Sequence, residues 1–446
     1  MKIYHALFCD MKTKIQDLFQ SLSVKNYRIY FIGQGISLIG TWMQRTTMSW
    51  YVYRLTGSPL LLGLIGFLSQ IPSVFISPFA GVWADKFNRL SILKVTQSLA
   101  LVQAMTLGIL VVTNTIQIWH LIILSLFSGI IEAADSPARH ALVIELVQKK
   151  SLLTNAIALN SASFNGARLI GPSVAGIIIA LSNEGICFLI NGFSFIPVLI
   201  SLFMIVIPYK EPPQREQSVF TEIKQGWKYA FHNLPIKFLI SNNAITTFFG
   251  MSYAVLIPIF AKDILHGNAQ TQGFLLSMSG VGALLGALYL ASRKSIRGLN
   301  YRMVYALSLF GVSLLMFSWS RYYPFSLFLM ILIGIGMMFQ MSTANTILQS
   351  VVTDEMRGRV MSLHSMASMS VAPFGSLMVG ALSKSIGAPL TLTICAIVCL
   401  LWSGYSISIQ KKVNPAIKSM MLKHEPTIQA IYPPPDFNVA LDKQNE

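Results

Sequence analysis

Twelve long apolar stretches limit the folds open to this chain more than any other feature of its sequence. A helix needs ~20 mostly apolar residues to cross the hydrocarbon core of a bilayer. Of the 446 residues, 54% are hydrophobic and only 11% are charged, whereas soluble domains carry about a quarter charged residues. We therefore predict an all-α polytopic membrane protein with 12 transmembrane helices. The apolar stretches lie near 27–53, 59–83, 91–113, 116–137, 154–182, 185–208, 237–261, 270–291, 301–319, 323–347, 360–383 and 387–409.

Basic residues are distributed unevenly among the segments between these stretches. If the amino terminus is cytoplasmic, the cytoplasmic segments hold 27 of the 33 Lys and Arg residues and the outer loops hold four. Cytoplasmic loops of membrane proteins carry an excess of Lys and Arg, so we predict that both termini are cytoplasmic. The net charge of +16 is thus spread over short loops on one side of a membrane. It does not form the basic face that nucleic-acid binding needs, and we expect no nucleic-acid partner.

A polar stretch in the middle of the chain divides the predicted spans into six and six. It places Phe220, Ile223, Trp227 and Phe231 on one helical face, which is typical of an amphipathic helix in the membrane interface. The tail after 410 is polar and contains three consecutive prolines, which favours disorder. The predicted divisions are a cytoplasmic segment 1–25, a six-helix half 26–208, a cytoplasmic linker 209–236, a second six-helix half 237–410 and a disordered cytoplasmic tail 411–446.

A weak internal repeat relates the two halves at an offset of about 204 residues. Gly171 then corresponds to Gly375, and Gly176 corresponds to Gly380. Chance similarity between two apolar sequences is the alternative explanation. Together with the six-and-six division, the repeat favours two pseudo-symmetric halves around a central cavity.

The loop between the second and third stretches combines a small residue with both signs of charge. It reads Gly-Val-Trp-Ala-Asp-Lys-Phe-Asn-Arg from Gly81 to Arg89. Gly81 allows two helices to approach closely, and Asp85 can pair with Lys86 or Arg89 across the loop. Asn88 tolerates a positive φ better than most residues, so we expect it to serve the turn.

The fourth stretch ends in the only carboxylates within the predicted spans. Glu132 and Asp135 are three residues apart and share a helix face, and Arg139 follows them. Ionisable groups at membrane depth are costly and usually line a pathway or pair with each other. Glu132 lies deeper and is the candidate for binding a proton, since desolvation favours the neutral carboxyl; an ordinary packed or water-exposed glutamate is the alternative. Asp135 either pairs with basic residues or lies solvated at the helix end.

The fifth stretch carries small residues on one face together with a proline. Ala167, Gly171, Pro172 and Gly176 let two helices pack closely, while the proline frees a carbonyl and bends the helix. Generic helix packing is the alternative explanation for this pattern.

Two arginines fall within predicted spans, Arg45 in the first and Arg168 in the fifth. Each is a candidate for binding an anionic substrate, for pairing with a carboxylate or for assisting proton coupling. A structural hydrogen-bonding role is equally consistent for Arg168. Gln34 and Gln44 are further candidate polar groups of the cavity.

These motifs resemble those of the major facilitator superfamily over residues 22–410. The 81–89 loop is similar to its Gly-x-Leu-Ala-Asp-Arg-x-Gly-Arg loop, with Asn88 in place of the usual glycine. The fifth stretch resembles its antiporter motif, with alanine replacing glycine at three positions. Stretches 33–63, 134–147 and 155–176 resemble the bacterial drug and siderophore exporter branch that includes the enterobactin exporter.

The resemblance implies how such a protein works. It implies alternating access by two six-helix halves, driven by a proton gradient without any bound cofactor or metal. It implies that Asp85, Arg89 and Asp135 form a switchable ion-pair lock on the inner side. The antiporter-like motif implies export of a siderophore or drug-like amphiphile across the bacterial inner membrane. We expect a monomer in the lipid bilayer with a small-molecule substrate.

Two other classes of function remain as alternatives. A lysophospholipid flippase would use the same fold but act on lipids. A membrane-embedded enzyme would need a catalytic motif, and the sequence contains no HExxH, GxSxG or P-loop. We therefore predict that the protein is not an enzyme.

Overall fold

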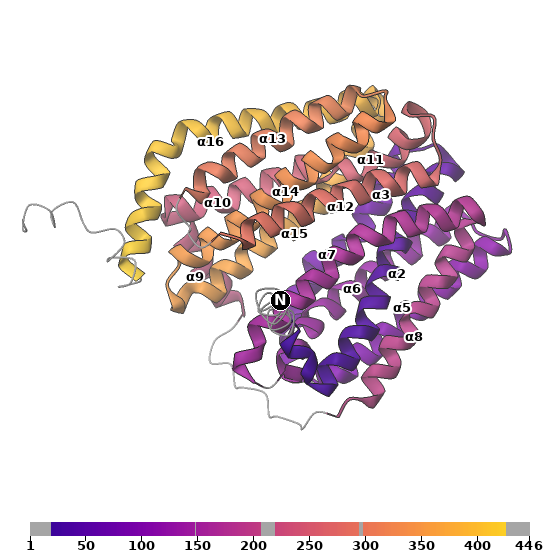
Figure 1. The fold of residues 1–446 in the computed structure, drawn as a ribbon, viewed down its shortest axis with the longest axis horizontal. Helices are drawn as coiled ribbons and strands as arrows, with labels where there is room; N and C mark the ends of the chain where they lie inside the picture. The colour runs from indigo at the N-terminus through magenta and orange to yellow at the C-terminus, as the bar shows by residue number, and fades with distance from the viewer. Residues whose placement is uncertain (1–18, 148, 207–218, 294–297, 425–446) are drawn as a thin grey trace, which may run out of the picture.

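The computed structural model describes residues 19–147, 149–206, 219–293 and 298–424, and within these ranges the chain is helical with short connections and no strand. Figure 1 shows two groups of long helices, one formed by the first half of the chain and one by the second. The groups approach each other at the upper right of Figure 1, and their other ends lie farther apart. The prediction of an all-α polytopic protein is confirmed.

In the described residues 19–147 and 149–206, the first group contains one 3₁₀ turn and seven helices. Helices α3 and α4 follow one path that is broken at Ser69 and Gln70, so the seven helices form six membrane-length paths. The elements are η1 (Gln20–Ser23), α2 (Lys25–Thr56), α3 (Pro59–Leu68), α4 (Ile71–Lys86), α5 (Arg89–Val112), α6 (Ile118–Val147), α7 (Lys150–Leu181) and α8 (Glu184–Met204).

The second group begins with the linker helix α9 and continues through six paths. The first of these paths contains two π-helical segments, which interrupt the regular hydrogen-bond ladder. The elements are α9 (Val219–His232), α10 (Leu234–Ile245), η2 (Thr246–Met251), α11 (Tyr253–Ile259), η3 (Phe260–Ile264), α12 (Ala269–Ala291), α13 (Leu299–Trp319), α14 (Tyr323–Val351), α15 (Asp354–Ile386) and α16 (Ala388–His424).

Within the residues that the structure describes, eleven helical paths are long and apolar enough to cross a membrane, and α2 is not among them. Its 32 residues span about 48 Å, which is sufficient length. Arg45 and three further basic residues lower its hydropathy, but it packs against α7 and α8 inside the first group. A twelfth span at α2, and the cytoplasmic placement of both termini, stay predictions.

Two predicted boundaries are wrong. The fourth stretch does not end near 137, because α6 continues through Pro137 to Val147 and buries Leu142 and Leu146. The tail is not disordered from 411, because α16 continues to His424. Val413 and Ile417, one turn apart, are buried in an apolar cluster with α10 and α14, and this packing supports the extra turns. Residues 425–446 lie outside the described ranges.

The linker helix α9 packs on α15 while two of its aromatic side chains stay exposed. Gly226 approaches Leu363 and Arg359 of α15. Trp227 and Phe231 stack at 4.9 Å between ring centroids and are about half exposed. This exposure is compatible with the predicted interfacial position; the side chains of Phe220 and Ile223 lie outside the described part of the chain.

The halves meet along two helix pairs, α7 with α12 and α3 with α15. We call the helix ends near Lys25 and Asp354 inner and the opposite ends outer, following the predicted orientation. A Cβ on Gly176 would lie 2.8 Å from the Ala269 carbonyl oxygen, and one on Gly380 would lie 2.7 Å from that of Pro59. The two glycines related by the sequence repeat therefore occupy matching contacts near the outer ends. Each lies against the first residue of the second helical path of the opposite half, Ala269 of α12 or Pro59 of α3.

Candidate functional site

Asp135 is the centre of a buried hydrogen-bond cluster. Its side chain is 2% exposed. It accepts hydrogen bonds from Arg139 Nε at 2.8 Å and from Thr96 Oγ1 and Gln97 Nε2 at 2.7 Å each. Asp135 is therefore not a solvated helix end: its charge is compensated by a guanidinium and two neutral donors of α5. Such a carboxylate is fixed in place by its partners.

Glu132 lies one turn farther towards the outer end and joins two arginines. Its carboxylate oxygens lie 3.6 Å from Arg45 Nη2 and 3.9 Å from Arg139 Nη2. The helix geometry places Glu132 about 21 Å from either end of α6. The side chains of Arg45 and Glu132 are nevertheless 51% and 39% exposed. Exposed charges at mid-helix depth usually line a water-filled cavity. The structure thus brings together Arg45 and Glu132, two predicted site residues that are 87 positions apart in the sequence.

Trp42 connects Arg45 to Arg168. The guanidinium carbon of Arg45 lies 5.2 Å from the centroid of the Trp42 ring, and that of Arg168 lies 5.8 Å from it. Phe164 packs edge-on against the same ring at 5.7 Å. Two guanidinium groups and the Phe164 ring thus surround the Trp42 indole. Trp42 was not among the residues predicted from the sequence.

The small residues of α7 make this arrangement possible. A Cβ on Gly171 would lie 2.6 Å from Trp42 Cβ and 3.0 Å from the Ile39 carbonyl oxygen, so glycine brings α2 close enough to set Trp42 beside Arg168. Ala167 is buried. Pro172 and Gly176 face α12 of the other half, because a Cβ on Gly273 would lie 2.3 Å from the Pro172 carbonyl oxygen. The motif therefore serves both the site and the contact between halves.

The other two candidate cavity residues, Gln44 and Gln34, stay predictions as members of the cavity. Gln44 donates to Gln103 Oε1 at 3.0 Å and accepts from Asn191 Nδ2 at 2.8 Å, so it ties α2 to α5 and α8. Gln34 is buried and its Oε1 has no hydrogen-bond partner among the described residues. It lies eleven positions before Arg45 on α2, about 16 Å along the axis.

The 81–89 loop is only partly described. The surroundings of Gly81 and the side chains of Asp85 and Lys86 lie outside the described part, so the lock with Asp135 stays a prediction. Arg89 forms an ion pair with Glu145 at the inner end of α6, a partner that the sequence analysis missed. Asn88 has φ −62° and accepts from Leu90 N at 2.9 Å, so it caps α5 at the turn.

The outer ends of the two halves are joined by polar contacts that the sequence analysis also missed. The Tyr53 hydroxyl donates to Asp263 of η3, and Lys262 Nζ lies 5.5 Å from the Tyr53 ring centroid. Gln272 donates to Ser49 Oγ at 2.8 Å and to the Thr46 carbonyl oxygen at 3.1 Å. These contacts close the outer end of the path between the halves.

Removing the Tyr53 hydroxyl should loosen this outer closure. We expect Tyr53→Phe to increase several-fold the rate at which a membrane-impermeant maleimide modifies a Thr46→Cys reporter from the outer side, because a hydrogen bond to a carboxylate contributes about 1.5–3 kcal/mol. Tyr322→Phe, at an exposed position, is the matched control. An unchanged rate would contradict the role of this contact.

A second buried polar cluster lies in the second half. Asn243 donates to Ser368 Oγ and approaches His364 Nε2 at 3.4 Å. His364 Nδ1 and the whole Gln340 amide have no hydrogen-bond partner among the described residues. Asn243, His364 and Ser368 lie on α10 and α15, and such scattered polar residues give no local signal in sequence, so their contact was not predicted.

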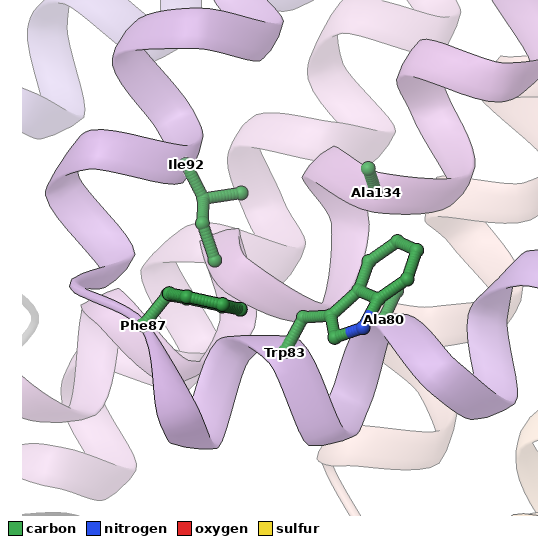
Figure 2. Close-up of a pocket in the computed structure, with 5 residues that line it drawn as sticks. All are labelled: Ala80, Trp83, Phe87, Ile92 and Ala134. Carbon is green, nitrogen blue, oxygen red and sulfur yellow. The ribbon is translucent and has the colours of Figure 1, made fainter.

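An apolar cavity of about 150 Å³ lies between α4, α5 and α6. Figure 2 shows Phe87 and Ile92 turned towards each other beside Trp83, with Ala80 and Ala134 completing the lining. Ligand pockets usually measure about 300–1,000 Å³ and carry a few polar groups. This cavity is smaller, purely apolar in its lining and separate from Glu132, so it is not the candidate site.

Comparisons with known proteins agree on one class. A family model described as transmembrane secretion effector matches residues 17–445. The chain is similar to the staphyloferrin A transporter of Staphylococcus aureus, with 26% identity over 87% of this chain and 97% of the relative. It is also similar to macrolide efflux protein A of Streptococcus pyogenes, with 22% identity over 85% and 96%, and to the multidrug efflux pump Tap of Mycolicibacterium fortuitum, with 20% identity over 83% and 90%.

Solved structures show the same fold. The chain aligns with an inward-facing, unoccupied bacterial homologue of the human lysosomal transporter Spinster at a TM-score of 0.68 and 12% identity, covering 88% of this chain and 98% of that one. It aligns with a peptide-bound POT family transporter at a TM-score of 0.71 and 12% identity, covering 87% and 96%.

Proposed function

The chain belongs to the transmembrane secretion effector family of the major facilitator superfamily, and on this premise we propose that it exports a small molecule by proton-coupled alternating access. It is a multi-pass membrane transporter and not an enzyme. The resemblance to the enterobactin exporter in particular stays a prediction. A siderophore transporter and two efflux pumps are among its relatives, which supports export of a siderophore or drug-like amphiphile from a bacterial cell.

Alternating access requires contacts that close one end of the path and can be broken. The outer contact between Tyr53 and Asp263 and the glycine contact between Gly273 and Pro172 are of this kind. Both belong to the outer part of the interface in which α7 packs on α12 and α3 packs on α15, so separation of the halves at the outer end would break them. They support a cycle in which the outer end opens as the inner end closes.

The observation that carries the proposed coupling is the position of Glu132. It is a partly exposed carboxylate at mid-membrane depth, held between Arg45 and Arg139 by ion pairs longer than 3.5 Å. Asp135, in contrast, is saturated with donors. Glu132 is therefore the carboxylate with access to protons from the cavity. Its protonation would release Arg45 and change the charge of the site, and the proton gradient would supply the driving force without a cofactor.

Everted membrane vesicles test this proposal directly. We expect an acidified lumen to lose protons when a transported siderophore, macrolide or dye is added outside. Glu132→Gln should abolish this proton release while exchange of substrate down its own gradient continues, because glutamine keeps the shape but cannot titrate. Glu355→Gln, at an exposed position of α15, is the matched control.

Each outcome of the vesicle experiment decides one part of the proposal. Substrate-induced proton release in wild type that persists in Glu132→Gln would remove Glu132 from the coupling. Substrate accumulation without any proton movement would contradict proton coupling but would still support export. The curated relatives named above give no support to the lipid-flippase alternative.

A further inference from the structure

Arg168 has no counter-charge in the part of the chain that the structure describes. Among the described residues no carboxylate lies within ion-pair distance of it, and its hydrogen bond is a long one of 3.7 Å from Nη2 to the Met337 sulfur. The side chain is partly buried about 27 Å along α7 from the helix start. An uncompensated charge taken out of water is costly. A bound ligand of negative charge would compensate it.

The position of Arg168 is suited to a transported ligand. It extends from α7 to Trp42 of α2 in its own half and to Met337 of α14 in the other half. It therefore lies between the halves and does not face lipid. A ligand bound there contacts both halves, which alternating access requires of its substrate.

Arg45 provides a second cation on the same indole. Both guanidinium groups lie within 6 Å of the Trp42 centroid, and Arg45 is half exposed. Its ion pair with Glu132 is long, at 3.6 Å, so a stronger anion can compete for it. Guanidinium groups bind carboxylates bidentately, which gives orientation as well as energy.

The charges of the whole cluster leave a surplus of one cation when all groups are ionised. Asp135 neutralises Arg139, and Glu132 neutralises Arg45, so Arg168 remains. The surplus favours an anion and disfavours a cation. The members of the cluster are Arg45, Glu132, Asp135, Arg139 and Arg168.

We propose that Arg168 and Arg45 form an anion subsite that selects substrates carrying a carboxylate, with the apolar or aromatic body of the substrate against Trp42, Phe164 and Met337. This inference rests on the proposed transport function and adds the chemical class of the substrate. An interior-negative membrane potential favours outward movement of an anion by about 2.3 kcal/mol per charge per 100 mV. The potential therefore acts in the same direction as export.

Binding to the purified, reconstituted protein tests the subsite with matched probes. The probes are citrate, benzene-1,3,5-tricarboxylate and salicylate, each paired with its methyl ester, and erythromycin as a cation. Trp42 fluorescence, obtained as the difference between wild type and Trp42→Phe, reports occupancy. We expect at least one carboxylate to bind at least about tenfold more tightly than its ester, the ratio that one charge-assisted hydrogen bond provides.

Variants assign this preference to the two arginines. Arg168→Gln should abolish the preference for the carboxylate, and Arg168→Lys should restore part of it because the charge returns without the planar fork. Arg45→Gln should weaken it. Arg321→Gln, on an exposed loop, should leave it unchanged. A preference that survives Arg168→Gln overturns the assignment, as does equal binding of every acid and its ester.

The same variants in everted vesicles separate this inference from the transport function. Loss of carboxylate transport in Arg168→Gln is the expected result. Active export of erythromycin or an uncharged dye, with no transport of any carboxylate, would overturn the anion subsite. The proposed export function would be unaffected by that result. If no compound is transported but carboxylate binding is intact, the result would contradict the proposed export function. The anion subsite would still be supported.

Discussion

Replacement of Gly273 by alanine is expected to shift the protein towards a conformation that is open at its outer end. In the described conformation a Cβ at this position would lie 2.3 Å from the Pro172 carbonyl oxygen and 3.3 Å from Gly176 Cα. Both neighbours are backbone atoms of α7, so they cannot turn aside as a side chain would. The added methyl group therefore forces α12 away from α7. A conformation in which the halves have separated there carries no such penalty, and the population shifts towards it.

Distances between spin labels at the outer ends measure this shift. Labels at Leu181 of the first half and Tyr322 of the second occupy exposed positions, and pulsed electron paramagnetic resonance gives the distribution of distances between them. Each 1.4 kcal/mol of selective destabilisation changes the ratio of the two conformations tenfold. Gly166→Ala is the control, because no atom lies within 4 Å of a Cβ there. An unchanged distribution in Gly273→Ala would show that the α7–α12 contact does not set the conformation.

The packing of the small-residue face of α7 could be predicted only in part from the sequence. The spacing of Ala167, Gly171 and Gly176 predicted close helix packing, and the structure confirms it. The partners were not predictable, because Gly171 meets α2 of the same half whereas Gly176 meets α12 of the other half. A pattern on one helix shows that a neighbour approaches closely, but only the three-dimensional fold shows which neighbour.

In the charged site, too, single residues could be predicted from the sequence but their partners could not. Glu132 and Arg45 were each singled out because ionised groups are rare in spans, but nothing in the sequence paired residues 87 positions apart. The fourth stretch was predicted to end near 137, before Arg139. In the structure α6 continues past Pro137, since neighbouring helices bury the turns that follow. Arg139 therefore lies inside the helix, one turn from Asp135, and neutralises it.

Removing the carboxylate of Asp135 is expected to have the largest effect on stability of any single substitution in the site. Asp135→Ala would leave Arg139, whose side chain is 13% exposed, with only the long ion pair to Glu132 at 3.9 Å. It would also orphan the Gln97 donor, whereas Thr96 keeps its hydrogen bond to the Leu93 carbonyl oxygen. Breaking one side of a buried ion pair costs about 3–5 kcal/mol. The midpoint of thermal unfolding, measured on purified protein in detergent, should fall accordingly, and little folded protein should reach the membrane.

The pair between Arg54 and Glu184 provides a matched comparison for this substitution. Glu184 is as buried as Asp135, with a side chain 6% exposed, but Arg54 is 51% exposed. Glu184→Ala therefore leaves a cation that water can solvate, and we expect a loss of about 1 kcal/mol or less from the broken pair.

The double variant Asp135→Ala/Arg139→Met isolates the electrostatic part of the loss. It removes both charges, so it should recover much of the stability lost in Asp135→Ala, because the cost of an unpaired buried charge disappears. Recovery would show that Asp135 mainly compensates Arg139. A double variant as unstable as Asp135→Ala would show instead that the hydrogen bonds from Thr96 and Gln97 hold α5 against α6, and that Asp135 acts through the packing of these two helices.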